Sequence, residues 1–360
     1  MKRVVFFVNS MQPSGGIERV IATLANKLSV KFEITILVKD DAKSFYSLNK
    51  SIKIDSINNI LHLNMHNKLS RIFNVLKTIF STSKSLQNYF EKNNFDYYYV
   101  THPLSVLEFY VAKINPQKVI ISEHASKEHY NIIYRVIKKL LYKRCHVYVV
   151  PTIADTLSYK EDGIPAVTIP HFRSELPYVN ANKKNRIVLN IGRFTSDKQQ
   201  RVLLNVWKKI ISNKEYSEWK LFIIGSGELE AELYTFVSEN NLQDTVKFFP
   251  PTSNIEEYYL KASIFALTSR SEGYGMVLLE AISFGLPCVS FDCPSGPKDI
   301  IQDKFNGYLV SLGREKEFEL RLTELMYDGR LQQEIGLNAY NSSQAWSEEI
   351  IFNKWLEILN

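Results

Sequence analysis

The chain of 360 residues has little cysteine and no long apolar segment. Its three cysteines, Cys145, Cys288 and Cys293, are odd in number and form no C-x-x-C motif, which favours a reducing compartment. The apolar run near the first residue, Val4 to Val8, is too short for a signal peptide and predicts a strand. No run approaches the roughly 18 apolar residues of a membrane-spanning helix. We therefore expect a cytoplasmic protein.

The positive charge of the chain is unevenly distributed. Residues 1–180 carry 24 Lys and Arg against 14 Asp and Glu, a net charge of +10, whereas residues 181–360 carry 20 against 24, a net charge of −4. This asymmetry predicts that the first half meets an anionic partner. No nucleic-acid-binding module is recognised, so a membrane with anionic lipids is favoured over a nucleic acid.

The most informative stretch is 263–297, in which the apolar runs 264–267 and 288–291 predict two buried strands. Between them a polar loop, 268–272, precedes a helix that opens near Gly273-Tyr274-Gly275 and ends around Gly285. A chain of this length favours two domains. The alternation of strands and helices in both halves predicts an α/β fold.

Two carboxylates frame the start of this helix. Glu272 follows the strand, where open α/β sheets bind ligands, and Glu280 lies about 7.5 Å along the helix axis. The first helix amides have no partner, and Gly273 and Gly275 permit a close approach, so the helix start is an anion site. This pattern suits a ligand that has a negative centre flanked by hydroxyl-bearing groups, such as a nucleotide sugar.

Three other strand-to-helix loops repeat the pattern. Gly15 and Gly16 follow the first strand, and the segment 225–228, G-S-G-E, follows another. Arg193 and Lys198 flank a third loop, so both cations can reach a phosphate there. None is a complete G-x-G-x-x-G fingerprint, which argues against an NAD-dependent oxidoreductase.

The segments 272–275 and 280–281, E-G-Y-G and E-A, with 285–289, G-L-P-C-V, resemble the E-x7-E region of the retaining glycosyltransferases of family 4. The resemblance implies the GT-B fold, with two Rossmann-like domains, a cleft between them and a C-terminal helix that crosses back to the first domain. The expected N-terminal acceptor-binding domain is 1–170 with 345–360. A linker at 171–185 and a nucleotide-sugar-binding domain at 186–344 follow.

The resemblance also implies roles for single residues. Glu272 holds sugar hydroxyls, Glu280 holds the ribose, and His124, in the segment Ser122-Glu123-His124, faces the donor sugar. The expected catalytic residues are Glu272, His124, Arg193 and Lys198. The expected donor-binding residues are Gly15, Gly16, Arg193, Lys198, Gly225, Gly227, Glu272, Gly273, Tyr274, Gly275 and Glu280.

The implied reaction transfers a sugar from a nucleotide-diphosphate sugar, expected to be a UDP-sugar, to a saccharide acceptor that is expected to be lipid-linked. No Asp-x-Asp triplet, the usual metal clamp of the other major glycosyltransferase fold, occurs in the sequence. We therefore expect neither metal nor cofactor. The resemblance implies retention of anomeric configuration and reaction on the front face of the donor. Bacterial surface-polysaccharide or lipid-linked oligosaccharide synthesis is the expected setting. A non-hydrolysing sugar-nucleotide epimerase of the same fold and a non-catalytic GT-B partner subunit remain alternatives.

The segment 129–144 predicts a helix that is both apolar and basic. One interpretation is a core-facing helix with a solvated basic face. The other is a helix that lies on the cytoplasmic face of the inner membrane and brings a lipid-linked acceptor to the enzyme. In that case the basic residues that bind the membrane or the acceptor are Arg135, Lys138, Lys139, Lys143 and Arg144.

Overall fold

A computed structural model of the chain describes residues 1–13, 16–59, 68–123, 132–173, 176–177 and 185–360. The chain forms two compact units, Met1–Phe172 together with Glu348–Asn360, and Arg173–Ser347. The structure thus begins the second unit within the segment 171–185, which the sequence analysis assigned to a linker. Most of that segment lies outside the described residues.

The first unit is built on a seven-stranded sheet in which every neighbouring pair is parallel, in the order β3-β2-β1-β4-β5-β6-β7. The strands are β1 (Arg3–Val8), β2 (Glu33–Val38), β3 (Lys53–Ser56), β4 (Tyr97–Val100), β5 (Val119–Ser122), β6 (Val147–Val150) and β7 (Ala166–Thr168). Apolar side chains occupy both faces of the central strands, as expected for a parallel sheet covered by helices on both sides.

Six α-helices belong to the described part of this unit: α1 (Gly16–Leu28), α2 (Lys68–Lys92), α3 (Pro103–Val111), α4 (Ile132–Leu141), α5 (Ile153–Glu161) and α13 (Glu348–Leu359). Side chains of α2 and α3 pack with Val5 and Phe7 on one face of the sheet. On α13, the buried Trp355 contacts the Tyr99 ring of β4, with ring centroids 5.9 Å apart.

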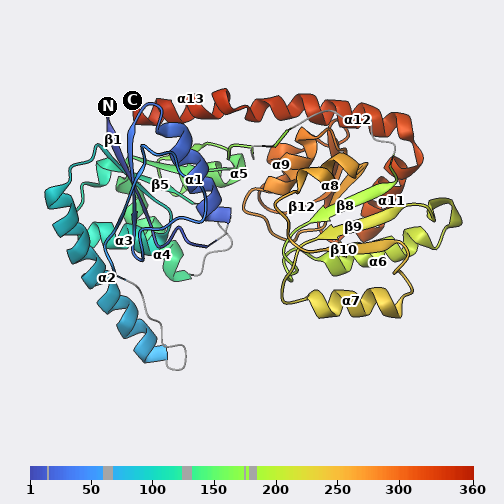
Figure 1. Cartoon of the computed structure of the whole chain (residues 1–360), viewed down its shortest axis with the longest axis horizontal. Coiled ribbons are helices and arrows are strands. Elements are labelled where there is room, and N and C mark those ends of the chain that lie inside the picture. Colours follow the sequence, from blue (N-terminus) through green and yellow to red (C-terminus); the bar gives the residue numbers. More distant parts are fainter. Residues whose placement is uncertain (14–15, 60–67, 124–131, 174–175, 178–184) are drawn as a thin grey trace. The chain divides into compact units, whose positions relative to one another are not determined.

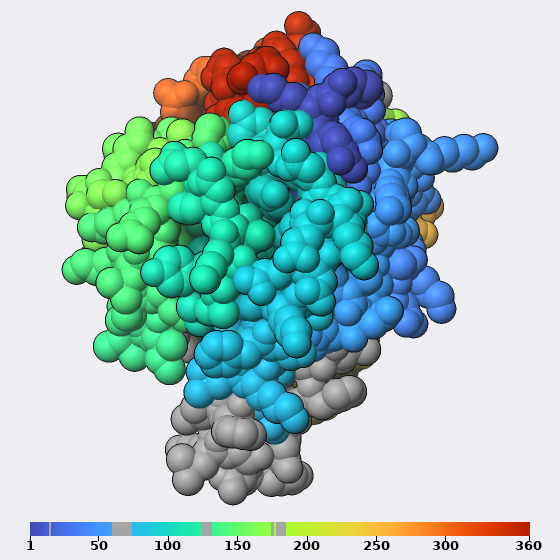
Figure 2. Space-filling view, turned by 90° about the vertical axis from the view of Figure 1, so that its left-hand side faces the viewer, coloured from blue at the N-terminus to red at the C-terminus, as the bar shows by residue number. Residues whose placement is uncertain are grey.

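The two ends of the chain lie side by side in this unit (Figure 1). The Lys2 ammonium donates hydrogen bonds to the carbonyl oxygens of Leu359, at 3.0 Å, and Asn360, at 2.8 Å. Figure 2 shows the same closeness on the surface, where C-terminal residues (red) adjoin N-terminal residues (blue). The last helix therefore completes the first unit, although it follows the second unit in sequence.

The second unit contains a six-stranded parallel sheet in the order β10-β9-β8-β11-β12-β13. Its strands are β8 (Ile187–Ile191), β9 (Lys220–Ile224), β10 (Val246–Phe249), β11 (Ile264–Leu267), β12 (Cys288–Asp292) and β13 (Gly307–Ser311). Its helices are α6 (Gln200–Ile211), α7 (Glu230–Glu239), α8 (Glu256–Lys261), α9 (Met276–Ser283), α10 (Pro297–Ile300), α11 (Glu315–Tyr327) and α12 (Gly329–Ser342).

The helices of the second unit cover both faces of its sheet. Side chains of α6, α7 and α11 pack with Val188, Ile264 and Val289 on one face. Side chains of α8, α9, α10 and α12 pack with Leu189 and Phe265 on the other face. The two parallel-sheet, Rossmann-like halves confirm the predicted α/β class.

Burial of Trp355 predicts that α13 stabilises the first unit. We expect Trp355→Ala to lower the free energy of unfolding by about 3–5 kcal/mol, because it removes a large buried ring and leaves a cavity. Urea denaturation followed by circular dichroism measures this loss. The control is Asn353→Ala on the exposed side of the same helix, for which we expect a change within about 0.5 kcal/mol. Equal midpoints for the two variants would show that the Trp355 ring contributes nothing.

Candidate functional site

The candidate site lies where the strand order of the second sheet reverses, at the neighbouring strands β8 and β11. Parallel strands end at the same edge, and the carboxyl ends on either side of such a reversal are where open α/β sheets bind ligands. Two loops leave this edge: 192–199, between β8 and α6, and 268–275, between β11 and α9. They carry six of the eleven expected donor-binding residues: Arg193, Lys198, Glu272, Gly273, Tyr274 and Gly275.

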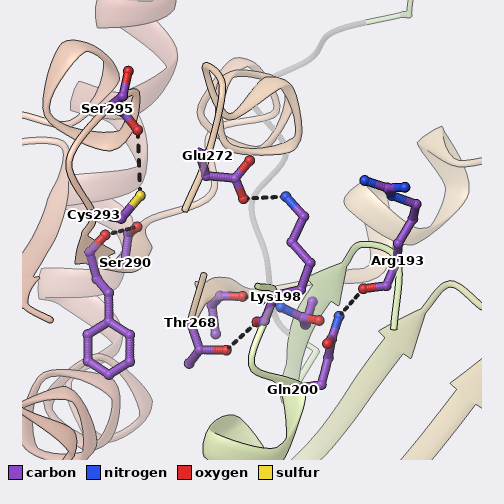
Figure 3. A network of polar contacts seen from close by, with 11 residues as sticks. Arg193, Lys198, Gln200, Thr268, Glu272, Ser290, Cys293 and Ser295 are labelled. Atoms are coloured by element: carbon purple, nitrogen blue, oxygen red, sulfur yellow. Dashed lines mark hydrogen bonds and ion pairs between the residues drawn. The ribbon is translucent and has the colours of Figure 1, made fainter. Parts of the chain in front are cut away.

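The two loops are joined through Lys198 and Glu272. The Lys198 ammonium donates a hydrogen bond of 2.6 Å to Glu272 Oε1, and the carboxylate is buried whereas the lysine is partly exposed (Figure 3). The Thr268 hydroxyl hydrogen-bonds the backbone carbonyls of Lys198, at 3.2 Å, and Gln199, at 3.1 Å. These contacts fix the lysine beside the carboxylate.

A second connection lies nearer the surface. The Arg270 amide donates to the Asp197 carbonyl at 2.7 Å, and the Arg270 guanidinium pairs with the Asp197 carboxylate at 2.9 Å. An exposed pair of this kind contributes little stability. Together with the backbone bond, it keeps the loops in register. The sequence analysis missed Thr268, Asp197 and Arg270, because their roles depend on contacts between distant segments.

Arg193 differs from Lys198 in having no carboxylate partner among the described residues. Its side chain is exposed, and in Figure 3 it extends to the same side of the loop as the Lys198 ammonium. The Gln200 side chain holds its backbone by donating to the Arg193 carbonyl at 3.0 Å. A charge that needs no intramolecular partner is available to a ligand.

The amino terminus of α9 lies in the second loop. Gly275 precedes the helix with φ of 94°, a conformation that favours glycine, and it has no side chain to cap the helix. The Leu278 amide donates to the Gly275 carbonyl at 2.9 Å. The amides of Met276 and Val277, which have no acceptor in the helix, can bind an anion. The helix therefore begins directly after Gly273-Tyr274-Gly275, as the sequence predicted, and Glu272 immediately precedes this segment.

The side chains of Tyr274 and Glu280 are both buried. The Tyr274 ring is buried, and its hydroxyl accepts a hydrogen bond from Trp346 Nε1. Burial also raises the pKa of Tyr274. Glu280 is buried within α9, and the Tyr259 hydroxyl donates to its Oε2 at 2.8 Å. The Tyr274 side chain thus packs the loop, and the expected contacts of Tyr274 and Glu280 with a donor stay predictions.

Gly225 and Gly227 have a packing role. A Cβ atom on Gly225 would lie 2.0 Å from the Gly192 carbonyl oxygen, and one on Gly227 would lie 2.5 Å from the Phe194 carbonyl oxygen. The Phe194 amide also donates to the Ser226 carbonyl at 2.9 Å. The two glycines let the loop after β9 pack directly against the loop that carries Arg193. Their expected contact with a donor stays a prediction.

Cys293 is a neighbour of the site that the sequence analysis did not connect with it. Burial raises the pKa of the Cys293 thiol to about 12, and the Glu272 carboxylate adds to this shift. The thiol is fully buried and donates to the Ser295 carbonyl at 3.5 Å (Figure 3). It is therefore neutral at physiological pH and packs behind the carboxylate.

Several expected residues belong to the first unit. His124 and Gly15 lie outside the described residues. Gly16 is exposed at the start of α1, and a Cβ atom added there would meet nothing within 4 Å. Glu123, which precedes His124, is fully buried and accepts a hydrogen bond of 2.9 Å from the Tyr148 hydroxyl.

The assignment of Lys138 to a basic surface is corrected by the structure. Lys138 is 3% exposed, pairs with Glu123 and donates to the Tyr159 hydroxyl at 2.9 Å. It points into the unit because the buried Glu123 carboxylate requires a cation. The other four expected basic residues are exposed: Arg135, Lys139, Lys143 and Arg144.

The described residues contain neither a cluster of metal-ligand side chains nor a helix that could span a membrane. No three or more His, Cys, Asp or Glu side chains are grouped there as metal ligands would be. None of the described helices combines the length and apolar character that a bilayer span requires.

Comparison with known proteins adds independent information. Residues 173–342 match the family described as Glycosyl transferases group 1. The amylovoran biosynthesis glycosyltransferase AmsD of Erwinia amylovora is 29% identical, with both chains covered completely. A Campylobacter jejuni alpha-1,4-N-acetyl-D-galactosaminyltransferase, named for the acceptor GalNAc-alpha-(1->4)-GalNAc-alpha-(1->3)-diNAcBac-PP-undecaprenol, is 26% identical over the whole chain and 98% of its own length.

Solved structures share the fold of the whole chain. A mutant of TarM from S. aureus, solved with fondaparinux, alpha-GlcNAc-glycerol and UDP, superposes with a TM-score of 0.79 at 16% identity, with both chains covered completely. This likeness confirms the predicted GT-B fold. The family match and the relatives support a glycosyltransferase.

The close approach at Gly225 predicts a large effect of one added methyl group. We expect Gly225→Ala to lower the free energy of unfolding by more than 1 kcal/mol, because the new Cβ atom collides with a backbone carbonyl. Gly329→Ala is the matched control, since a Cβ atom there meets nothing within 4 Å, and we expect a gain of about 0.4–1 kcal/mol. Chemical denaturation of both variants measures these changes. A neutral Gly225→Ala would contradict the packing role.

Proposed function

We propose that the chain is a retaining glycosyltransferase of family 4 that transfers a sugar from a UDP-sugar to a saccharide acceptor without a metal ion. The acceptor hydroxyl attacks the anomeric carbon on the front face, the bond to the β-phosphate oxygen breaks, and UDP leaves. The hydroxyl proton goes to the departing phosphate. The protein must hold the donor and stabilise the negative charge that develops on that phosphate.

The observation that carries the proposal is the arrangement of cations at the carboxyl ends of β8 and β11. Arg193 has no carboxylate partner among the described residues, and Lys198 lies 2.6 Å from Glu272. The charges of Lys198 and Glu272 cancel, so Arg193 supplies the unbalanced positive charge. Its planar guanidinium binds two phosphate oxygens at once. The amides at the start of α9 add partial positive charge nearby.

Glu272 has a second role in this proposal. A carboxylate offers about four acceptor positions, of which Lys198 occupies one. The others can accept hydrogen bonds from hydroxyl groups of the donor sugar. Lys198 in turn has three donors, so it can keep its bond to Glu272 and still donate to a phosphate oxygen. One ion pair thus binds the sugar and the diphosphate of the same donor.

The names of similar proteins support the finer assignment. AmsD acts in amylovoran biosynthesis, and the Campylobacter jejuni relative is named for an undecaprenol-diphosphate-linked acceptor. The TarM structure contains UDP. We therefore propose a UDP-sugar donor and a lipid-linked saccharide acceptor in bacterial polysaccharide synthesis.

Loss of the ion pair tests this function. We expect Lys198→Met and Glu272→Gln each to lower the turnover number by about 10²–10³-fold, the usual effect of removing one preorganised charge or donor from a transition state. Release of UDP is measured with UDP-linked Glc, Gal, GlcNAc and GalNAc and undecaprenyl-diphosphate-linked N-acetylgalactosamine saccharides as acceptors. The control is Lys208→Met on α6. Lys208 is exposed, and its substitution removes the same positive charge.

Four outcomes would contradict the proposal. Turnover of either variant at the wild-type rate would remove the ion pair from the mechanism. Conversion of the donor without any acceptor would favour the epimerase, and UDP binding without turnover would favour a non-catalytic subunit. Activity that EDTA abolishes and a divalent ion restores would disprove the proposed independence from metal.

We further propose that α4 attaches the enzyme to the cytoplasmic face of an anionic membrane. Four of its aliphatic side chains face solvent: Ile132 is 75%, Ile133 66%, Val136 51% and Leu140 66% exposed. The fully buried residue of this helix is Lys138, whereas Leu141 packs partly against the core. The usual pattern is therefore inverted over most of the helix, because the ion pair of Lys138 anchors it and the four aliphatic side chains remain exposed. Exposed apolar and basic side chains on one helix are typical of interfacial membrane binding.

The membrane proposal predicts separate apolar and electrostatic contributions. We expect Ile133→Ser with Leu140→Ser to reduce co-sedimentation with vesicles that contain anionic phosphatidylglycerol. Lys139→Gln with Lys143→Gln should lower the partition coefficient about thirtyfold, because each cation contributes about 1 kcal/mol near such a surface. As an apolar control, Ile153→Ser with Leu157→Ser removes two exposed side chains from α5. Equal sedimentation of the α4 and α5 variants would exclude α4 as the contact.

A further inference from the structure

The first sheet has its own reversal of strand order, between β1 and β4. The carboxyl ends of these strands meet at one edge, which is the general position of a ligand site in an open α/β sheet. Asn9 and Ser10 follow β1, and His102 follows β4. All three line one pocket of about 290 Å³. This volume is close to the lower end of the range for small-molecule sites, about 300 Å³.

The pocket combines polar groups from three segments with an apolar wall. Lys39 and Asp40 follow β2, and Glu108 extends from α3. The apolar wall comes from α2 and the start of α3: Val75, Ile79 and Leu104. A few polar groups that converge beside apolar side chains are characteristic of ligand sites.

The Lys39–Glu108 pair lies at the buried side of this pocket. The Lys39 ammonium donates to Glu108 Oε1 at 2.6 Å, and Glu108 is only 2% exposed. Asp40 Oδ1 is buried and has no hydrogen-bond partner among the described residues, whereas its Oδ2 accepts from the Gln12 side chain at 2.9 Å. A buried acceptor without a donor is costly, so this oxygen favours a ligand that donates hydrogen bonds.

His102 contributes a neutral group. Its Nδ1 accepts a hydrogen bond of 3.2 Å from the Leu104 amide, so its proton is on Nε2. Burial lowers the pKa of His102, which keeps the ring neutral at physiological pH. One lysine therefore faces two carboxyl groups, and the pocket has no surplus of positive charge. This balance disfavours a phosphate and favours a neutral ligand rich in hydroxyl groups.

We propose that this pocket binds one sugar ring of the acceptor saccharide. Hydroxyl groups of the ring donate to Asp40 and Glu108, Lys39 donates to a ring or hydroxyl oxygen, and the apolar wall packs against the C–H face of the sugar. This assignment rests on the proposed glycosyltransferase function, to which it adds the acceptor residues. With this assignment, the strand-order reversals of the two sheets differ in charge. The reversal in the second unit presents Arg193 to an anion, whereas the pocket in the first unit has no surplus of positive charge.

The test fills the pocket without touching the donor site. Val75→Trp places a large ring in the pocket, and the control Lys77→Trp places the same ring on the exposed side of α2, two residues away. A further variant, Asp40→Asn, keeps the shape of the side chain and removes its charge. Circular dichroism and thermal unfolding confirm that each variant folds.

The probes are the methyl α-glycosides of Glc, Gal, GlcNAc and GalNAc, detected by saturation-transfer NMR, with calorimetry of UDP as a second readout. We expect at least one glycoside to bind to the wild type and to Lys77→Trp, with at least tenfold weaker binding to Val75→Trp and weaker binding to Asp40→Asn. The affinity for UDP should stay unchanged in all of them.

The outcomes distinguish this inference from the proposed function. Absence of binding by all four glycosides to the wild type, equal binding by Val75→Trp and Lys77→Trp, or displacement of the glycoside by inorganic phosphate would each overturn the sugar site and leave UDP binding intact. Failure of the wild type to bind UDP would instead contradict the donor site in the second unit.

Discussion

The contact between Lys198 and Glu272 is possible because β8 and β11 are neighbours in space although more than 70 residues separate them in sequence. A parallel sheet brings the carboxyl ends of its strands to one edge, and the reversal of strand order opens that edge between two loops. The Thr268 hydroxyl then ties the loops through backbone carbonyls. The paired side chains therefore do not have to order themselves when a donor binds, which lowers the entropic cost of binding.

Buried ion pairs have a different consequence in the first unit. Lys39–Glu108 and Glu123–Lys138 each place a cation and a carboxylate where apolar side chains normally pack. Such a pair contributes little net stability, because desolvation offsets the attraction, but loss of one partner is strongly destabilising. The pairs therefore fix where α3 and α4 meet the rest of the unit. In α4 this arrangement leaves the aliphatic side chains outside, where a membrane can cover them.

The sequence was sufficient for features that depend on local patterns. It predicted β11, β12 and the polar loop with Glu272, because apolar periodicity and glycine positions are local signals. It missed α3 and α5, which are nine residues each, and in α3 the buried Glu108 interrupts the apolar stripe. It also misplaced Lys138, since no local pattern reveals that a lysine on helix α4 faces the buried carboxylate of Glu123, which follows strand β5. The same limit applies to Gly225, whose neighbour Gly192 belongs to a distant loop.

Net charge over a whole unit is a poor guide to the ligand of its site. The first half of the sequence carries +10, yet the pocket at its strand reversal balances Lys39 against two carboxyl groups. The second half carries −4, yet its reversal presents Arg193 without a carboxylate partner among the described residues. Much of the positive surplus of the first half instead lies on surfaces such as α4. Long-range charge attracts a partner to a surface, whereas the few groups at a strand end decide what binds there. The anionic donor proposed for the second unit and the neutral saccharide proposed for the first rest on those local groups, whereas the proposed membrane contact rests on the exposed basic residues of the first unit.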